Sequence, residues 1–431
     1  MKYGGTSGRA TPVDFRTALF RGLAEDGSLY VPERLPRLDD AVLHTLPERT
    51  LHDVACVVLA PFLPELDAAT LRGIVTRALD FELPLVLLED RVHLLELFHG
   101  PTLAFKDVGA RFMAQAMSHY LAAEQREIAI LVATSGDTGS AVAHGFHGVP
   151  HTTVFVLYPA GRVSALQERQ MATLGGNVRA IEVAGSFDDC QRLVKHALAT
   201  RPPSAGRELT TANSINIGRL LPQVTYYLWA WAQWRRDAGA ADAAPHVVVP
   251  SGNFGNLTAA AYARAMGMPM GRLVAATNAN DVVPVFLRTG RYEPRASVAT
   301  LSNAMDVGDP SNLARLRALY GDSAERLGAH VEAHAIGDDG TLREIRVIAA
   351  HTGTVLDPHT AVGVRVARAL PDDADVIVAA TAHSAKFADV MHAAFGRDID
   401  LPPELTALMQ RPMFVERIPA EPDAFAALLA R

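Results

Sequence analysis

The chain has 431 residues, of which 49% are hydrophobic and 20% are charged, and its net charge is −7. This composition is typical of a globular protein with two or three domains, and the acidic balance gives no support for a nucleic-acid-binding surface. We find neither a run of about 18 apolar residues that would predict a membrane span nor the pattern of a secretory signal. The two cysteines, Cys56 and Cys190, are too few for a disulfide framework, so a cytoplasmic protein is expected.

The predicted elements change in character along the chain. Residues 1–90 predict a mostly helical region, including a helix over 51–63 that ends at a proline. From about residue 91, short apolar runs alternate with helical segments, which is typical of a parallel α/β sheet. Strands are expected over 128–133, 153–157, 178–183, 247–249, 273–276 and 376–380. Helices are expected over 107–121 and 384–395, and a surface connection over 235–245.

Three segments share one design, in which an apolar strand leads through a polar turn into a helix. They read ILVATSGDTGSAVAHGF (130–146), HVVVPSGNFGNLTAAAYARAM (246–266) and VIVAATAHSAKFADVMHAAF (376–395). Ligands of open α/β sheets bind at the carboxyl ends of the strands. We therefore expect the three turns to converge on one site.

The SGNFGN turn predicts an anion site. Gly252 and Gly255 allow the backbone to take a positive φ and to approach a ligand closely, and the N–H groups at a helix start attract anions. The turn has neither a P-loop lysine nor a dinucleotide motif, which favours a lone phosphate. Taken alone, an ordinary capped helix start is the favoured interpretation, because short glycine turns are common.

The SGDTGS turn offers hydroxyl groups from Ser135, Thr138 and Ser140, backbone N–H groups and the carboxylate of Asp137. This set suits a substrate carboxylate together with a polarised ring or amino group. The same residue types are preferred as helix N-caps, so both interpretations stand.

Lys106 follows three apolar residues in the stretch HGPTLAFKD (99–107). Burial lowers the pKa of a lysine amine, and such an amine can form a Schiff base with an aldehyde. Combined with a phosphate site, this points to pyridoxal phosphate (PLP) as the cofactor. The alternative is a solvated lysine in the first turn of a helix.

The motifs together resemble the threonine synthase family of PLP enzymes, in its longer bacterial and fungal branch. The resemblance covers nearly the whole chain and includes ELFHGPTLAFKDVGARFMAQ (96–115), ATSGDTGSAVAHGF (133–146), NSINIGRLLPQVTYY (213–227), VPSGNFGNLTA (249–259), TLSNAMDVGDPSN (300–312) and TAHSAKF (381–387). It implies a fold-type II α/β architecture like that of the tryptophan synthase β subunit. The expected parts are a helical region over 1–90, a smaller domain over 91–212 with Lys106 and the SGDTG loop, and a larger domain over 213–431 with the phosphate loop.

The resemblance also implies roles at the cofactor. Lys106 is the Schiff-base lysine, and Phe105 is expected to pack behind it and keep water away. Asp137 is placed near the ring hydroxyl, and Thr381 faces the pyridine nitrogen with a neutral hydroxyl. The residues matched to the PLP phosphate loop are Gly252, Asn253, Phe254, Gly255 and Asn256.

At the substrate, the resemblance matches Ser135, Gly136 and Thr138 to the loop that meets the carboxylate. Ser214, Asn216 and Arg219 are expected to grip the substrate phosphate, a task suited to the planar fork of arginine. No metal site is expected, because the histidines are scattered and form no HExxH unit.

The activity implied by the resemblance is the conversion of O-phospho-L-homoserine and water to L-threonine and phosphate. The alternatives are a related PLP-dependent phospho-lyase and a catalytically silent PLP-binding protein. A small molecule is the expected partner, without nucleic acid or membrane, and a monomer is the expected state.

The chain departs from the family pattern at Ser7, where arginine is common, and at Ala380 and Ser384, which replace glycine and proline. A local backbone adjustment is expected around Ala380 and Ser384.

Overall fold

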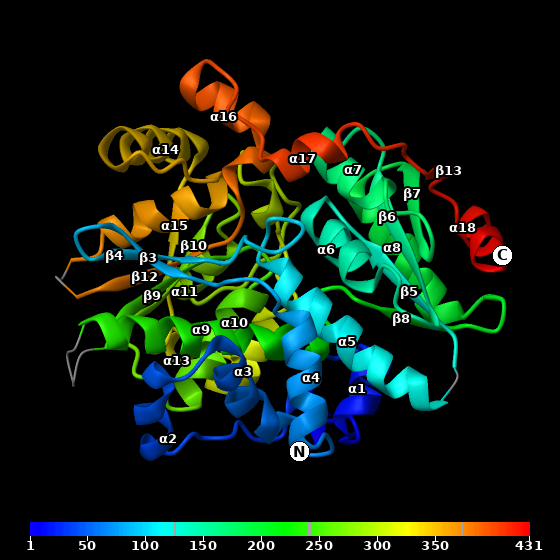
Figure 1. The fold of residues 1–431 in the computed structure, drawn as a ribbon, viewed down its shortest axis with the longest axis horizontal. Helices are drawn as coiled ribbons and strands as arrows, with labels where there is room; N and C mark the ends of the chain where they lie inside the picture. Colours follow the sequence, from blue (N-terminus) through cyan, green and yellow to red (C-terminus); the bar gives the residue numbers. More distant parts are fainter. Residues whose placement is uncertain (125, 239–243, 372–373) are drawn as a thin grey trace.

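The computed structural model describes residues 1–124, 126–238, 244–371 and 374–431. Two large β-sheets lie side by side, and helices cover them (Figure 1), while a third sheet among the described residues has two strands near the N-terminus. Their central strands, such as β5 (Ile128–Ala133) and β12 (Val376–Ala380), are buried along their whole length. Such continuous apolar runs are typical of parallel sheets whose faces are both covered.

The larger sheet has the strand order β11-β10-β9-β12-β4-β3. All of its neighbours pair in parallel except β3 and β4. Besides β12, its strands are β3 (Leu85–Glu89), β4 (Val92–Glu96), β9 (His246–Pro250), β10 (Leu273–Thr277) and β11 (Glu332–Ala335). The helices of this half are α9 (Ile217–Ala238), α10 (Gly255–Ala265), α11 (Val282–Thr289), η3 (Asn303–Met305), α12 (Leu313–Tyr320), α13 (Ala324–Gly328), α14 (Asp338–Thr352), α15 (Pro358–Arg368), η4 (Ser384–Lys386) and α16 (Ala388–Phe395).

The smaller sheet has the order β13-β7-β6-β5-β8, and all of its pairs are parallel. Its other strands are β6 (Thr152–Pro159), β7 (Val178–Ala184), β8 (Glu208–Thr211) and β13 (Val415–Pro419). Its helices are α6 (Asp137–Phe146), α7 (Ala165–Ala172), α8 (Phe187–Thr200), α17 (Pro403–Leu408) and α18 (Pro422–Leu429).

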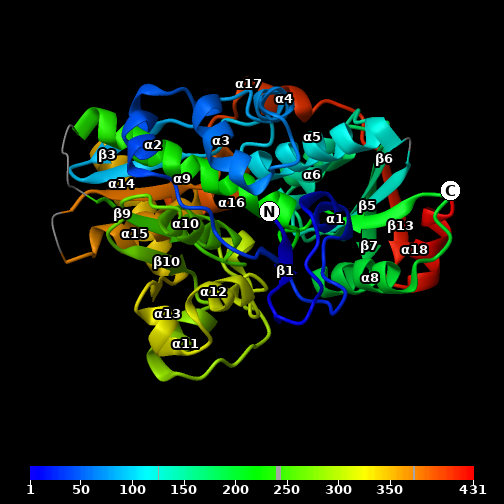
Figure 2. The same cartoon turned by 90° about the horizontal axis from the view of Figure 1, so that it is seen from below.

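The N-terminal region packs against the helices that join the two halves. It contains β1 (Tyr3–Gly5), α1 (Phe15–Arg21), β2 (Tyr30–Pro32), α2 (Asp40–Thr45), η1 (Leu46–Glu48), α3 (Leu51–Leu59), η2 (Ala60–Phe62) and α4 (Ala68–Ala78). In Figure 2 these helices lie along α9 and α5 (Lys106–Glu124). Helix α3 packs on α9, α4 packs on α5, and α5 in turn contacts α6 and α9. Helix α5 therefore stands between the two sheets.

Most predicted elements agree with the structure. The strands expected over 128–133 and 376–380 coincide with β5 and β12, and the other four expected strands lie within β6, β7, β9 and β10. The helix expected over 107–121 lies within α5. The connection expected over 235–245 is only partly described: α9 continues to Ala238, and 239–243 lie outside the described residues.

Two predicted helices are wrong in detail. The helix expected over 384–395 is broken at Phe387, whose backbone (φ −122, ψ 54) separates η4 from α16. The helix expected over 51–63 ends at Leu59 and continues as the 3-10 turn η2, which contains Pro61. Proline lacks the N–H group that an α-helix would use at that position.

The two sheets do not follow single stretches of the sequence. β4 lies within the range expected for the smaller domain, yet it pairs with β12 in the larger sheet. β13, near the C-terminus, pairs with β7 in the smaller sheet. In Figure 1 the chain after α16 crosses from one half to the other through α17, which contacts α7.

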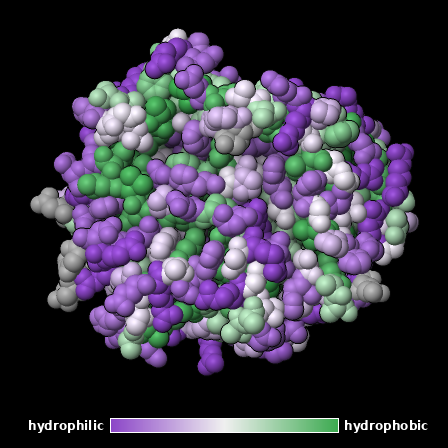
Figure 3. Space-filling view, viewed as in Figure 1, coloured by the Kyte–Doolittle hydropathy of each residue, from purple (hydrophilic) through white to green (hydrophobic). Residues whose placement is uncertain are grey.

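Among the described residues, no helix combines the length and the hydrophobicity that a membrane crossing needs. The face seen in Figure 3 carries hydrophobic side chains in separate groups among hydrophilic ones.

Candidate active site

Two of the three polar turns leave from neighbouring strands of the larger sheet. β9 and β12 pair in parallel, with Val248 opposite Val378. The turn that follows Pro250 and the turn that follows Ala380 therefore start at the same edge of this sheet. This edge is where open α/β sheets bind their ligands.

The Lys106 segment is fastened to the end of β12. The N–H group of Phe105 donates to the carbonyl of Thr381 at 2.9 Å, and that of His383 donates to Leu103 at 3.1 Å. Leu103 has a positive φ of 55°, so a tight turn precedes the helix. Helix α5 then begins at Lys106, beside the carboxyl end of β12.

The amine of Lys106 is half-buried, and within the described part of the chain it has no hydrogen bond or ion pair. Burial lowers the pKa of this amine; the charge of Asp137 opposes the shift, while Lys386 and Arg219 add to it. The amine lies 5.8 Å from the centroid of the Phe105 ring. An amine with a lowered pKa and without such a partner is available for chemistry.

The SGDTG loop, which is the third polar turn, is joined to the turn after β12 by a buried ion pair. The Nζ atom of Lys386 lies 2.7 Å from Oδ1 of Asp137, and Gln167 donates to the same oxygen at 3.0 Å. Burial by itself would raise the pKa of Asp137, but the charges of Lys386 and Lys106 and these hydrogen bonds hold it below its usual range. Asp137 is therefore an anion that belongs to the smaller sheet and faces cations of the other segments.

The backbone of the SGDTG loop requires glycine. Gly136 has φ 139 and ψ −87, and a Cβ there would meet the side chain of Gln167. The hydroxyl of Thr134 accepts hydrogen bonds from Gly136 and Gly139 at 2.9 and 2.8 Å. Ser135 and Thr138 remain half-buried on the loop, so both can face a small ligand.

The SGNFGN loop packs closely on the segment that contains η3. A Cβ on Gly252 would come within 2.6 Å of the Cα of Met305, so close packing requires this glycine. The positive φ expected at Gly252 and Gly255 is found instead at Phe254, which has φ 59 at the cap of α10. The Oδ1 atom of Asn256 accepts hydrogen bonds from the hydroxyls of Tyr226 and Tyr227 at 2.5 and 2.6 Å. Both tyrosines act as donors here, so the amide is oriented, and its buried Nδ2 atom has no hydrogen-bond partner among the residues described.

The unpartnered Nδ2 donor of Asn256 provides a test of the cofactor. A buried donor without an acceptor costs about 1–3 kcal/mol. The donor lies in the first turn of α10, where backbone N–H groups attract a phosphate. These residues fit the phosphate group of PLP.

The three residues expected at the substrate phosphate lie in different environments. The hydroxyl of Ser214 accepts from Asn253 of the phosphate loop at 2.6 Å. Arg219 is buried and donates to the carbonyl of Ala212 at 2.5 Å, while its Nε atom has no partner. Burial lowers the pKa of Arg219 to about 10.

Asn216, the third of these residues, uses its side-chain amide to bond backbone groups of the protein. Its amide donates to the carbonyls of Leu19 and Thr211 and accepts from the N–H group of Gly218. These bonds hold the turn before α9, and a substrate contact of Asn216 stays a prediction.

Thr381 is buried at the end of β12, and its N–H group donates to the hydroxyl of Thr360 at 3.2 Å. The hydroxyl of Thr360 in turn donates to the buried carboxylate of Asp357. This chain fixes the backbone from which the Thr381 side chain extends.

Some residues that shape the site were not singled out from the sequence. The buried carboxylate of Asp107 accepts from the N–H and hydroxyl groups of Thr102 at 2.8 and 2.7 Å, and Lys386 donates to the carbonyl of Thr102 at 2.7 Å. Gln167 reaches Asp137 from α7. The adjacency of Lys106 and Asp107 was visible in the sequence, but the partners of Lys386 and Gln167 were not, because they lie far away in the chain.

Two of the three positions that depart from the family pattern, Ser7 and Ser384, have separate local environments. Ser7 lies at the surface, where its hydroxyl donates to Asp26. Ser384 is buried and begins η4, with His383 accepting from the N–H group of Ala385 at 3.1 Å. The 3-10 turn carries Lys386 inward to its ion pair.

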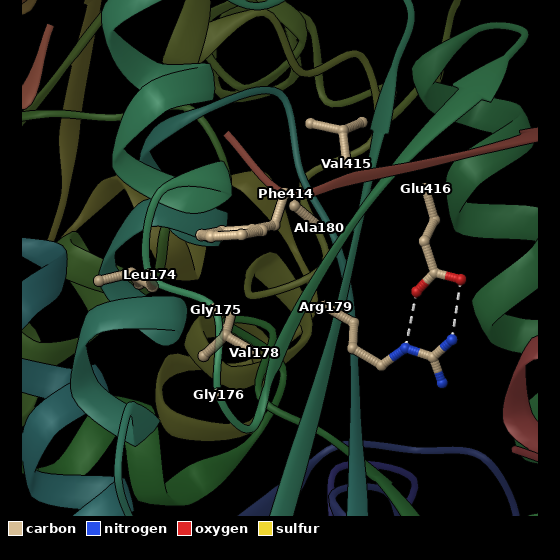
Figure 4. A pocket seen from close by; sticks show the side chains of 9 residues that line it. All are labelled: Leu174, Gly175, Gly176, Val178, Arg179, Ala180, Phe414, Val415 and Glu416. Carbon is tan, nitrogen blue, oxygen red and sulfur yellow. Dashed lines mark hydrogen bonds and ion pairs between the residues drawn. The ribbon is translucent and has the colours of Figure 1, made fainter. Parts of the chain in front are cut away.

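A surface hollow lies away from these residues, between the Leu174–Gly176 turn, β7 and the start of β13 (Figure 4). Phe414 and Val415 border it, and Arg179 bonds Glu416 through two nitrogens at 2.7 and 2.8 Å. Since these two charges satisfy each other, the hollow offers an anionic ligand little attraction.

Known families match the chain along nearly its whole length. Residues 84–382 match the family described as pyridoxal-phosphate dependent enzyme, 2–79 match threonine synthase N terminus, and 360–429 match threonine synthase, C-terminal. The chain is 40% identical over 410 residues to threonine synthase of Serratia marcescens, which covers 95% of this chain and 94% of that protein.

Solved structures agree with these matches. A PLP-bound threonine synthase from Brucella melitensis has a TM-score of 0.93 at 38% identity and covers 100% of this chain and 99% of its own. Threonine synthase from Escherichia coli has a TM-score of 0.90 at 38% identity, with the same coverage. PLP is therefore the cofactor, and the fold is that of fold-type II PLP enzymes.

Proposed function

This chain belongs to the threonine synthase family, and we propose that Lys106 is its cofactor-binding and proton-transferring residue. The reaction converts O-phospho-L-homoserine and water to L-threonine and phosphate, and the enzyme is a lyase. The observation that carries the assignment is the placement of Lys106, which begins α5 beside the end of β12 and whose amine has no hydrogen bond or ion pair among the described residues.

PLP, once bound, supplies an electron sink for the carbon atoms of the substrate. The surrounding residues supply its binding site. The backbone at Gly252, the oriented amide of Asn256 and the N-terminus of α10 hold its phosphate. Asp137 is kept anionic near Lys106 by Lys386 and Gln167.

The lowered pKa of Lys106 suits a general base. A neutral amine accepts a proton from the substrate carbon and returns it later in the same turnover. Burial disfavours the protonated amine, and the charges of Lys386 and Arg219 act in the same direction.

The substrate is held at its two charged ends. The half-buried Ser135 and Thr138, with the backbone at Gly136, receive the carboxylate. Arg219 and Ser214 lie on the segment that binds the substrate phosphate. Phe105 shields the amine from water, which protects reactive species.

The reaction takes place in the cytoplasm. Cys56 and Cys190 are both free thiols, which is consistent with a reducing compartment.

A comparison of two lysine variants tests the assignment. Lys106→Ala should abolish threonine and phosphate formation, and borohydride reduction of its PLP complex should leave no cofactor on the 96–115 peptide. Lys195→Ala, which removes an exposed lysine of α8, is the matched control and should behave like the unaltered protein.

The products distinguish the outcomes. If the unaltered protein formed 2-oxobutyrate in place of threonine, it would be a phospho-lyase. If it formed neither product, it would be a silent PLP-binding protein. Normal turnover by Lys106→Ala would overturn the role of this residue.

A further inference from the structure

Asn312 presents an unused hydrogen-bond donor inside the protein. Its side chain is fully buried, and its Oδ1 atom accepts from Nη1 of Arg315 at 2.6 Å. A guanidinium group can only donate, so this contact fixes which end of the amide faces Arg315. The Nδ2 atom at the other end is buried and has no hydrogen-bond partner in the part of the chain that the structure describes.

The free donor faces the phosphate loop. The Nδ2 atom of Asn312 lies 3.4 Å from the position that a Cβ on Gly255 would take, and Gly255 is the first residue of α10. The segment is tied to the loop by two backbone donors: the N–H group of Ser311 bonds the side chain of Asn253 at 2.6 Å, and that of Asn312 bonds its carbonyl at 3.3 Å. The donor is thus held against the loop.

Arg315 adds a buried positive charge behind this donor. Its guanidinium is fully buried and donates to the carbonyls of Tyr30, Ile215 and Ser214 at 3.0, 2.6 and 3.4 Å. These acceptors are neutral, and among the described residues no carboxylate forms an ion pair with it. A buried cation without a counter-charge is costly, and an anion at the head of α10 would lower this cost.

We propose that Asn312 is a phosphate-binding residue of this site, whose Nδ2–H group donates to the phosphate of PLP at the start of α10. Arg315 is its positioning residue, because it orients the amide and supplies positive charge behind it. The inference rests on the proposed function, since it requires the phosphate loop to hold the cofactor. It adds a ligand from a segment some 60 residues beyond the loop (Asn253 to Asn312), which lies outside the glycine turn itself.

Two variants of the full chain test this proposal. Asn312→Asp keeps an oxygen for Arg315, removes the donor and adds a negative charge, while Asn312→Ala removes the whole amide. Loss of a hydrogen bond to a charged group should raise the Kd of PLP about 10- to 100-fold, and Asn312→Asp should be the weaker binder because its carboxylate repels the phosphate. Asn177→Ala is the control, since this asparagine donates to Phe146 and Thr152 in the other half of the protein.

Pyridoxal, which lacks the phosphate, separates a ligand contact from a general structural role. The proposal expects the Kd of pyridoxal to change less than about 3-fold in both Asn312 variants. Equal weakening of PLP and pyridoxal, or an unchanged Kd of PLP, would overturn it. An unchanged Kd of PLP with a raised KM for O-phosphohomoserine would assign the donor to the substrate phosphate instead.

The outcome is distinguishable from failure of the proposed function. Binding of PLP and pyridoxal is measured by visible absorbance without substrate, so it does not depend on turnover. If the unaltered chain released no phosphate from O-phosphohomoserine but Asn312 variants lost PLP selectively, the function would fail while the phosphate contact would stand.

Discussion

The ammonium group of Lys386 lies 2.7 Å from Oδ1 of Asp137, and both side chains are buried. Asp137 begins α6 at the end of the smaller sheet, whereas Lys386 lies in the turn after β12 of the larger sheet. Lys386 also donates to the carbonyl of Thr102 in the segment before Lys106. One lysine thus joins the three segments that surround the candidate amine.

Removal of one partner of this ion pair should be strongly destabilising. Lys386→Met leaves the Asp137 carboxylate buried without its counter-charge, and we expect the free energy of unfolding to fall by about 3–5 kcal/mol. The measurement is urea unfolding of the single variants and of Lys386→Met/Asp137→Asn. The double variant should recover part of the loss, whereas additive losses would contradict a direct coupling.

The SGDTG loop should not tolerate a side chain at Gly136. Gly136→Ala combines a strained backbone at φ 139 with a clash against Gln167, which in turn bonds Asp137. We expect a stability loss above the about 1–2 kcal/mol of strain alone, together with a higher KM for the substrate. Gly148→Ala is the matched control, because this glycine has φ 73 but open space around it. Similar losses in both variants would show that the clash with Gln167 is unimportant.

The phosphate loop makes a separate prediction at Gly252. Gly252→Ala brings a Cβ within 2.6 Å of the backbone of Met305, so the loop must shift. We expect the Kd of PLP, measured by absorbance titration, to rise by at least about 10-fold, the equivalent of one lost hydrogen bond to a charged group. Gly337→Ala, at an ordinary φ of −80 with no neighbour within 4 Å, should leave the Kd unchanged. Unaltered PLP binding in Gly252→Ala would contradict the close packing of this loop.

Asp107 should impose a pH dependence on stability. Burial raises the pKa of its carboxyl from 3.8 to about 6, although hydrogen bonds from Thr102 oppose the shift. The folded state therefore holds this proton more tightly than the unfolded state. Its contribution, on the order of 3 kcal/mol, is fully present below pH about 4 and is lost as the pH rises through about 6.

The check is the unfolding free energy of Asp107→Asn and of the unaltered chain between pH 4 and 7. The variant should lack the decline that the unaltered protein shows with rising pH. Equal slopes would mean that Asp107 titrates normally in the folded state.

Local patterns in the sequence were sufficient for most elements of the fold. The apolar runs of β5 and β12 end where polar residues begin, so their bounds could be predicted residue by residue. The helical period over 107–121 likewise marked the body of α5. The break at Phe387 escaped this approach, because a 3-10 turn and a short helix share the residue types of one continuous helix.

The sequence by itself also determined the chemistry of the site. The SGNFGN turn and the lysine after an apolar run together indicated a phosphate group and an amine, although each taken alone also fits an ordinary helix start. Residue types and their spacing carry this information because backbone freedom at glycine and the pKa response of a lysine are local properties.

Only the tertiary structure decided which charges and donors face one another. The pairing of Lys386 with Asp137 joins residues on different sheets, and the orientation of the Asn312 amide depends on Arg315 and on the packing of its segment against Asn253. The placement of β13 beside β7 is equally non-local. Such contacts are selected by the burial and electrostatics of the whole fold, where a charge or donor left without a partner is costly, and no single stretch of sequence contains both sides of them.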